Sequence, residues 1–347
     1  MDKSINNPTK TVLIFTKTET EIEQISTIIK QNTTSFANSG ADGMKEVLYL
    51  LKSFAEHKWL CYLTTLDWVD TVNFGIQVKN MENSSIIRLD ETALNEQIDL
   101  IMVRRLGSVE QQRDKVKSMM EHLDKTYTGV VINPPKTVLY ALNKYTYLEY
   151  LGAKGFNVPK TFYRNNDVTH EELMAEFPDS ENWIVKPTTG ECGNSVSVLS
   201  KTNPDFFTNK KSKVGGWIVQ QKIDDIANGE LQLVFTGDHF SHAWRKIYRK
   251  AYTPFGVYSQ KNEDLKFADY IPTEEELAQS LEILKSLRET GIDIHIGRID
   301  FIKGNPNTIL EVEMVNPEID TDPNRIDSII QDVINLSESL INDKNNA

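Results

Sequence analysis

The feature that most constrains the fold is an alternation of short apolar runs with longer amphipathic segments in the first 135 residues. Runs short enough for buried strands lie at 11–15, 59–63, 98–103 and 129–133. Between them, helices are expected over 20–31 and 109–123, and apolar residues recur at helical spacing over 44–54. Because strands that alternate with helices build parallel sheets, a doubly wound α/β domain is expected here. The prolines of "NPP" at 133–135 mark its expected end.

The pattern changes after this boundary, to capped helices and strand material with hairpin-like turns. A helix over 143–154 is expected to end at Gly155, and helices over 169–177 and 274–288 begin with Thr-x-x-Glu capping boxes. The strand segments lie at 182–187, 196–200, 216–223 and 230–247. An amphipathic helix at the end of the chain is expected to serve packing.

Composition narrows the class of protein. The chain has 347 residues, 25% of them charged, and a net charge of −12, which argues against a general basic surface for nucleic acid. No apolar run approaches the roughly 20 residues that span a bilayer, and the N-terminus lacks the apolar stretch of a signal peptide. The only cysteines, Cys61 and Cys192, predict neither a disulfide framework nor a zinc site, so a cytoplasmic protein is expected.

The stretch "DFIKGNPNTILEVEMVNP" from Asp300 to Pro317 carries the strongest chemical signal. Glu311 and Glu313 are two residues apart in strand-like sequence, so both side chains point to one face. Two carboxylates that close repel each other unless water or a cation separates them. Asp300 adds a third carboxylate across the "GNPN" turn, and hard divalent cations such as Mg²⁺ prefer oxygen ligands. The alternative is a surface hairpin with solvated acids.

Several cations accompany these acids. Arg298 lies two residues before Asp300 and suits a two-bond grip on phosphate or carboxylate. Lys186 ends an apolar strand, where an unpaired ammonium is costly, and phosphate oxygens would pair with it. The backbone of the Gly190–Ser195 loop could close over the same anion. The alternative is a hairpin whose lysine extends to water.

A further pair of cations, Arg245 and Lys246, lies in "HAWRKIY" on opposite faces of a strand. One of them is expected to face the same cleft as Lys186, and the other to be solvated. The sequence contains no Walker-type phosphate loop, no GxGxxG after the first strand and no hint of a Ser/His/Asp triad.

Taken in order, these segments resemble the ATP-grasp superfamily, which includes glutathione synthetase, D-alanine–D-alanine ligase and the RimK-type peptide ligases. The resemblance covers about Asn133 to Asn316, and the upstream α/β segment resembles the pre-ATP-grasp domain. It implies a pre-ATP-grasp domain over 1–135, a lid and central subdomain over 136–216, and a C-terminal subdomain with the metal site over 217–347.

The resemblance also implies roles for individual residues. The nucleotide-binding set consists of Lys144, Lys186, Gly190, Gly193, Ser195, Gln220, Gln221, Ile223 and Glu230. The implied metal ligands are Asp300, Glu311 and Glu313. Arg298, Lys246 and Arg245 are the candidate catalytic cations. The family's usual closing pattern is Glu-x-Asn, and Glu313 replaces the asparagine, as in members that resemble the D-cycloserine-forming ligase.

The activity that the resemblance implies is ATP-dependent ligation of a carboxylate to an amine through an acyl phosphate, releasing ADP and phosphate. The cofactors would be ATP and Mg²⁺, expected as two ions, with Mn²⁺ as an alternative. An amino acid or small peptide is the expected substrate, a homodimer is one expected assembly, and neither nucleic acid nor a membrane is an expected partner. Arg104 and Arg105, after an apparent core strand, would hold a substrate carboxylate or form salt bridges.

Two other classes of function stay open from the sequence. One is a carboxylate kinase or ring-closing ligase, and the other is a regulatory protein that binds nucleotide without turnover. A complete set of acids and cations favours a working enzyme over a regulatory binder.

Overall fold

A computed structural model describes residues 10–31, 42–165, 169–190, 196–200, 215–248, 265–304, 306–318 and 325–346. The chain divides into two compact units. Unit 1 comprises Met1–Gly107, Asp114–Lys136 and Asn316–Ala347, and unit 2 comprises Ser108–Arg113 and Thr137–Val315. Residues 316–347, which the sequence analysis grouped with the C-terminal subdomain, therefore belong with the N-terminal domain.

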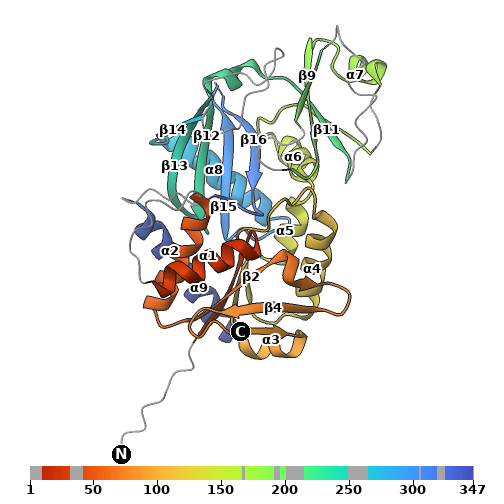
Figure 1. The fold of residues 1–347 in the computed structure, drawn as a ribbon. Helices are drawn as coiled ribbons and strands as arrows, with labels where there is room; N and C mark the ends of the chain where they lie inside the picture. The colour runs from red at the N-terminus through yellow and green to blue at the C-terminus, as the bar shows by residue number, and fades with distance from the viewer. Residues whose placement is uncertain are drawn as a thin grey trace, which may run out of the picture. The chain divides into compact units, whose positions relative to one another are not determined.

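Unit 1 is built on a seven-stranded sheet (Figure 1). Its strands are β1 (Thr11–Thr16), β2 (Leu60–Thr65), β3 (Val69–Asp70), β4 (Gly75–Asn80), β5 (Ile86–Leu89), β6 (Leu100–Met102) and β7 (Val130–Ile132). The neighbours β2-β1-β6-β7 pair in parallel, which confirms the predicted α/β class. Strand β4 pairs antiparallel with β2, β3 and β5, an extension that the sequence analysis did not predict.

Among the helices of unit 1, those over 19–30 and 91–97 begin directly after a residue whose side chain caps them. The helices of this unit are α1 (Glu19–Lys30), α2 (Asp42–Glu56), α3 (Glu91–Gln97), α4 (Arg113–Thr126) and α9 (Ile326–Asn345). The Thr18 side chain accepts a hydrogen bond from the backbone N–H of Glu21 and so caps α1. Every residue of β1 is buried, as expected of a central strand covered on both faces. The apolar stripe of α9 is buried, and this helix contacts α2 and β7.

Unit 2 contains a four-stranded antiparallel sheet in the order β10-β9-β11-β8. Its strands are β8 (Thr161–Arg164), β9 (Asn182–Pro187), β10 (Ser197–Ser200) and β11 (Trp217–Gln221). Trp183 and Val185 of β9 pack with Leu173 of α7 (His170–Glu176) in a small core. Because side chains alternate along a strand, Lys186 lies on the face opposite this core.

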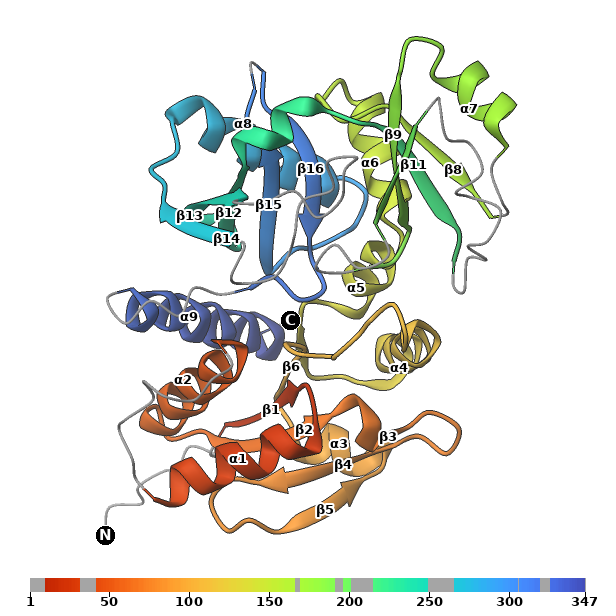
Figure 2. The same cartoon turned by 45° about the horizontal axis from the view of Figure 1, so that its top comes forward.

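The second sheet of unit 2 has five antiparallel strands in the order β14-β13-β12-β15-β16. They are β12 (Glu230–Thr236), β13 (His239–Tyr248), β14 (Leu265–Asp269), β15 (Ile296–Ile302) and β16 (Thr308–Glu313). Helix α8 (Glu274–Arg288) lies along one face of this sheet (Figure 1, Figure 2). Buried residues of α8 and of α6 (Lys144–Ala153) share one core with the inward side chains of β12, β15 and β16.

Both predicted capping boxes are present: Thr169 with Glu172 begins α7, and Thr273 with Glu276 begins α8. Pro135 is the first residue of α5 (Pro135–Ala141), a helix that the sequence analysis did not predict. Proline suits that position, because the first N–H of a helix has no partner within the helix. No helix in the described part of the chain is both long and apolar enough to cross a membrane.

Candidate functional site

The face of the five-stranded sheet opposite its apolar core collects polar side chains from three adjacent strands. Gln232 of β12 is the Cα partner of Asp300 in β15, and Asp300 is the partner of Glu311 in β16. Arg298 is likewise opposite Glu313. Directly opposed residues of an antiparallel pair share a face, so these five side chains lie on one side of the sheet. The residues between them point into the core on the other side.

Asp300 and Arg298 form a two-bond pair within this face. The Nε of Arg298 donates to Oδ1 of Asp300 at 2.7 Å, and its second nitrogen donates to Oδ2 at 2.9 Å. Gln232 donates to the same Oδ2 at 3.0 Å, and the indole N–H of Trp244 donates to Gln232. Asp300 is only 3% exposed, so this network holds a charged carboxylate in a fixed position.

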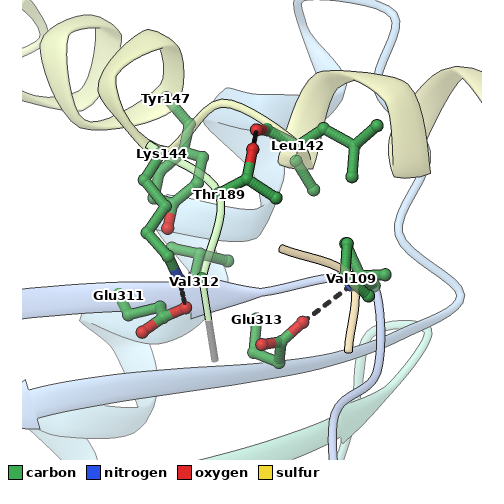
Figure 3. A pocket seen from close by; sticks show the side chains of 11 residues that line it. Val109, Leu142, Lys144, Tyr147, Thr189, Glu311, Val312 and Glu313 are labelled. Carbon is green, nitrogen blue, oxygen red and sulfur yellow. Dashed lines mark hydrogen bonds and ion pairs between the residues drawn. The ribbon is translucent and has the colours of Figure 1, made fainter. Parts of the chain in front are cut away.

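Lys144 reaches Glu311 from the first turn of α6. Asn143 caps the helix by accepting a hydrogen bond from the N–H of Tyr145, and the N–H of Lys144 donates to the carbonyl of Thr188 at 3.0 Å. These contacts fix the start of the helix, and the Lys144 ammonium forms an ion pair with the Glu311 carboxylate (Figure 3). Residues 167 positions apart are thereby brought together.

Glu230 belongs to a second charged group on the same face. Tyr248 donates to one oxygen of Glu230, and the Lys246 ammonium lies 3.7 Å from the other. Glu230 and Lys246 are Cα partners on β12 and β13, which places both on the face that carries Asp300. Arg245 lies on the opposite face and donates to the carbonyl of Asn228 at 3.0 Å. Of the two candidate cations, Lys246 therefore lies on the sheet face that carries Glu230 and Asp300, and Arg245 does not.

Lys186 is the one site lysine that lacks a polar contact to its ammonium within the described residues. It is 8% exposed on β9, where its Cα partner is Ile218. Burial and, to a smaller extent, the nearby Lys144 charge lower the pKa of its ammonium to about 7, while Glu230 acts in the opposite direction. A buried ammonium with these neighbours is a strong attractor for an anion.

The pKa of Lys186 predicts a pH-dependent stability cost. The unfolded state binds the proton more tightly, so the free energy of unfolding should rise as the pH increases from about 7 towards 10.5. We expect Lys186→Met to be more stable than the wild type at pH 7, and this advantage to shrink by about 2 kcal/mol at pH 9. Urea unfolding at the two pH values measures the difference, and the exposed strand residue Lys266 provides the control Lys266→Met. An advantage that is constant with pH would contradict the lowered pKa.

A pocket in unit 2 brings part of this group to one place (Figure 3). Its lining includes Lys144 and Tyr147 from α6, Thr189 and Gly190 after β9, and Val109, and from β16 and just beyond it Glu311, Val312, Glu313 and Val315. Thr189 accepts a hydrogen bond from Arg113 at 3.0 Å and donates to the carbonyl of Leu142. Gly190, predicted to belong to a phosphate loop, therefore lines the same pocket as Lys144. The other predicted loop residues, Gly193 and Ser195, lie outside the described residues.

The chemistry of the carboxylates fits a hard cation, but each of them already has a partner of the chain. Asp300 binds Arg298, Glu311 binds Lys144, and Glu313 accepts the backbone N–H of Val315 at 2.8 Å. Within the described residues, no group of three or more His, Cys, Asp or Glu side chains is arranged to hold a metal ion. The oxygen donors and their shared face suit Mg²⁺, which would have to compete with Lys144 for Glu311.

The predicted adenine-side residues lie at the end of β11 and just beyond it. Gln220 is buried, and its side chain donates to the hydroxyl of Thr161 at 2.8 Å. Gln221 is exposed, and Ile223 precedes a short 3₁₀ helix over Asp224–Asn228. The Gln220 side-chain amide is thus bonded within the sheet. A ligand at this segment would therefore contact backbone N–H and C=O groups.

Arg104 and Arg105 form salt bridges within unit 1. The Nε of Arg104 lies 2.6 Å from Glu46, and its guanidinium also donates to the carbonyl of Pro317. Arg105 donates to Glu21 at 3.0 Å. Burial by itself would raise the pKa of Glu21, but the bond and charge of Arg105, with hydrogen bonds from Thr16 and the Lys17 backbone, lower it overall. The salt-bridge alternative for both arginines is therefore the arrangement that the structure contains.

Two polar residues near the charged face of unit 2, Gln232 and Tyr147, were not predicted from the sequence. Gln232 alternates with leucines in "ELQLVF", so the period-two pattern could have placed it beside Glu230. Tyr147 lies three residues after Lys144 on α6, and an aromatic at helical spacing gives no signal that separates a site residue from the core. Burial raises the pKa of the Tyr147 hydroxyl well above its usual value, and the charges of Glu313 and Asp300 act in the same direction.

Comparison with known proteins identifies structural relatives only at low sequence identity. No family model and no curated protein sequence matches the chain. The solved structure of D-cycloserine synthetase DcsG matches with a TM-score of 0.67 at 17% identity, over 95% of this chain and 99% of that one. D-alanine–D-alanine ligase from Bacillus anthracis complexed with ATP matches with a TM-score of 0.61 at 11% identity, over 97% and 100% of the two chains. The ATP-grasp ligase PsnB, complexed with a phosphomimetic variant of a minimal precursor, Mg and ADP, matches with a TM-score of 0.57 at 12% identity, over 95% and 99%.

Proposed function

We propose that this chain, whose fold is that of the ATP-grasp ligases, is an ATP-dependent enzyme that joins a carboxylate to an amine. The observation that carries the proposal is the charged group of unit 2, in which Lys144 and Arg298 pair with Glu311 and Asp300 on one sheet face. Lys186 completes this group as a buried ammonium. Such an arrangement of cations and acids suits a polyphosphate and its metal.

The cations would hold the phosphates of ATP. Lys186 offers an ammonium that has no polar contact within the described residues, so an incoming phosphate oxygen displaces no partner there. Lys144 and Arg298 would have to exchange a carboxylate for phosphate, and Arg298 can keep a planar two-bond grip in either case. The backbone at Gln220, Gln221 and Ile223 would contact adenine, and Glu230 would contact the ribose.

Asp300, Glu311 and Glu313 would hold Mg²⁺. When bound, the ion would neutralise charge on the transferred phosphoryl group. Lys144 and the cation would compete for the Glu311 carboxylate, which pairs with Lys144 in the free protein. Binding of phosphate by Lys144 would free Glu311, and binding of the cation by Glu311 would free Lys144, so nucleotide and metal should strengthen each other's binding.

The reaction that suits this group has two steps. A carboxylate oxygen of the substrate attacks the terminal phosphorus of ATP, and ADP leaves, which gives an acyl phosphate. An amine then attacks the acyl carbon, loses a proton and expels phosphate, which gives an amide. The chain's own contribution would be to position the phosphates and balance their charge, and no covalent bond to the protein is needed.

The substrates that fit this proposal are amino acids or small peptides. Such a molecule could supply the carboxylate, the amine, or both groups in a ring-closing reaction.

Two other functions would use the same charged group differently. A carboxylate kinase would stop at the acyl phosphate. A regulatory nucleotide-binding protein would bind ATP without turnover. The rigid support of Asp300 by Arg298 and Gln232 favours an enzyme, because preorganised charges are what catalysis requires.

The proposal is tested by screening amino acids and short peptides, singly and in pairs, for stimulated release of ADP and phosphate. Release that requires both an acid and an amine, with a product whose mass corresponds to an amide, would support the ligase. An acyl phosphate trapped by hydroxylamine, with no amide, would identify the kinase. Binding of ATP without turnover across the screen would leave the regulatory protein as the answer.

A further inference from the structure

Tyr147 carries a buried hydroxyl whose place in the pocket has no explanation in packing. The residue lies one helical turn after Lys144 on α6, so the two side chains lie on the same side of the helix. Tyr147 is 1% exposed, and its ring belongs to the core that α6 shares with the five-stranded sheet. A phenylalanine would fill this space equally well, so the hydroxyl calls for a separate reason.

The hydroxyl points towards β16, the strand that carries Glu311 and Glu313 (Figure 3). Its proton has no acceptor among the described residues, while the backbone N–H of Val312 is directed at its oxygen and lowers the pKa of the hydroxyl as a hydrogen-bond donor does. A buried hydroxyl whose proton has no acceptor costs stability, so such groups in folded proteins usually have a function or a missing ligand.

The other tyrosines of the same helix do have partners. Tyr145 donates to Glu149 at 2.6 Å, and Tyr150 donates to the carbonyl of Ser286 at 2.8 Å. Among the tyrosines of α6, a hydroxyl proton without an acceptor is therefore specific to the one that lines the pocket with Lys144 and Glu311.

We propose that the Tyr147 hydroxyl donates a hydrogen bond to a terminal phosphate oxygen of a nucleotide held by Lys144. This inference rests on the proposed function, and it assigns Tyr147 a binding role that the sequence pattern did not indicate. A neutral hydroxyl donates a directional hydrogen bond and adds no charge. It would therefore orient a phosphate that the Lys144 ammonium attracts. The hydroxyl proton would then have an acceptor in the complex and none in the free protein.

The test is to compare Tyr147→Phe with the wild type in binding Mg-ADP, Mg-ATP and AMP by titration calorimetry. We expect affinity for Mg-ADP and Mg-ATP to fall about tenfold, since a hydrogen bond to a charged group is lost, and affinity for AMP to be unchanged. The ligand-free variant should unfold at the same or a higher temperature than the wild type, because the buried hydroxyl that it loses has no acceptor for its proton.

The matched control is Tyr150→Phe, which removes a hydroxyl that donates to Ser286 and does not line the pocket. It should lower the unfolding temperature and leave nucleotide affinity unchanged. Tyr147→Phe with wild-type affinity for Mg-ADP and Mg-ATP would overturn this inference alone. A wild-type protein that binds no Mg-nucleotide would overturn the proposed function and this inference together.

Discussion

Replacing Glu311 with glutamine is expected to lower the rate of ADP formation at least about 100-fold. Glu311 shares a sheet face with Asp300 and receives the Lys144 ammonium, so it contributes negative charge where a metal would have to bind. Glutamine keeps the shape of the side chain but is neutral, and neutral oxygens hold hard divalent cations weakly. The measurement is the initial rate with the acid and amine that the substrate screen identifies.

The control for this variant is Glu282→Gln, which makes the same substitution at an exposed glutamate of α8. It should leave the rate within about twofold of the wild type, because surface substitutions away from the site have small effects. Urea unfolding of Glu311→Gln confirms that the protein is folded under assay conditions. A folded Glu311→Gln enzyme that retains more than a tenth of the rate would contradict the metal-binding role of this carboxylate.

Arg104→Met is expected to lower the free energy of unfolding of the chain by about 3–5 kcal/mol. Arg104 is 2% exposed and pairs with Glu46, which is 3% exposed. Methionine would leave the Glu46 carboxylate buried without its cation and the Pro317 carbonyl without its donor. Removing one partner of a buried pair is costly because the remaining charge has no compensation. Denaturant unfolding of the two proteins measures the loss.

The neighbouring residue provides the matched control. Arg105 also pairs with a glutamate, but its side chain is 21% exposed, so Arg105→Met should cost about 1 kcal/mol or less. The double variant Arg104→Met with Glu46→Met should recover much of the loss, since no buried charge remains. If Arg104→Met instead keeps wild-type stability and raises the KM for the acid substrate, Arg104 holds a substrate carboxylate after all.

Local patterns made much of the fold predictable. Short apolar runs identified β1, β2, β6 and β7, and Thr-x-x-Glu sequences identified the first residues of α7 and α8. The antiparallel strands β3 to β5 were missed: β3 has two residues, β5 is mostly exposed, and β4, although buried, has only Ile76 and Val78 as large apolar residues. The expected helix over 109–123 begins at Arg113 in the structure, since apolar spacing marks a helix better than its ends.

The candidate site was predictable only where one strand carried it. The period of two placed Glu311 and Glu313 on one face, and Arg298 and Asp300 on one face, from sequence spacing alone. The contact of Lys144 with Glu311 depends on how α6 packs in unit 2, which residue spacing does not encode. The choice between Arg245 and Lys246 likewise depended on which face of β13 the core covers.

Tertiary contacts also decided the roles of Arg104 and Arg105 and the placement of residues 316–347, which sequence patterns could not predict. "VRRLGS" follows a parallel strand, which is where an open α/β sheet presents ligand-binding residues, yet both arginines meet glutamates of α1 and α2. Residues 316–347 follow β16 directly in sequence but belong to unit 1. The apolar stripe of α9 predicted burial correctly, whereas the partner that buries it is a property of the tertiary fold.

The most direct test of the account is equilibrium binding of ATP, with and without Mg²⁺, to the wild type and to Lys186→Met. The account predicts that the wild type binds one ATP, that withholding Mg²⁺ weakens this binding, and that Lys186→Met binds at least about tenfold more weakly despite being more stable. Equal affinity in the two proteins, or no binding of ATP to the wild type, would contradict it.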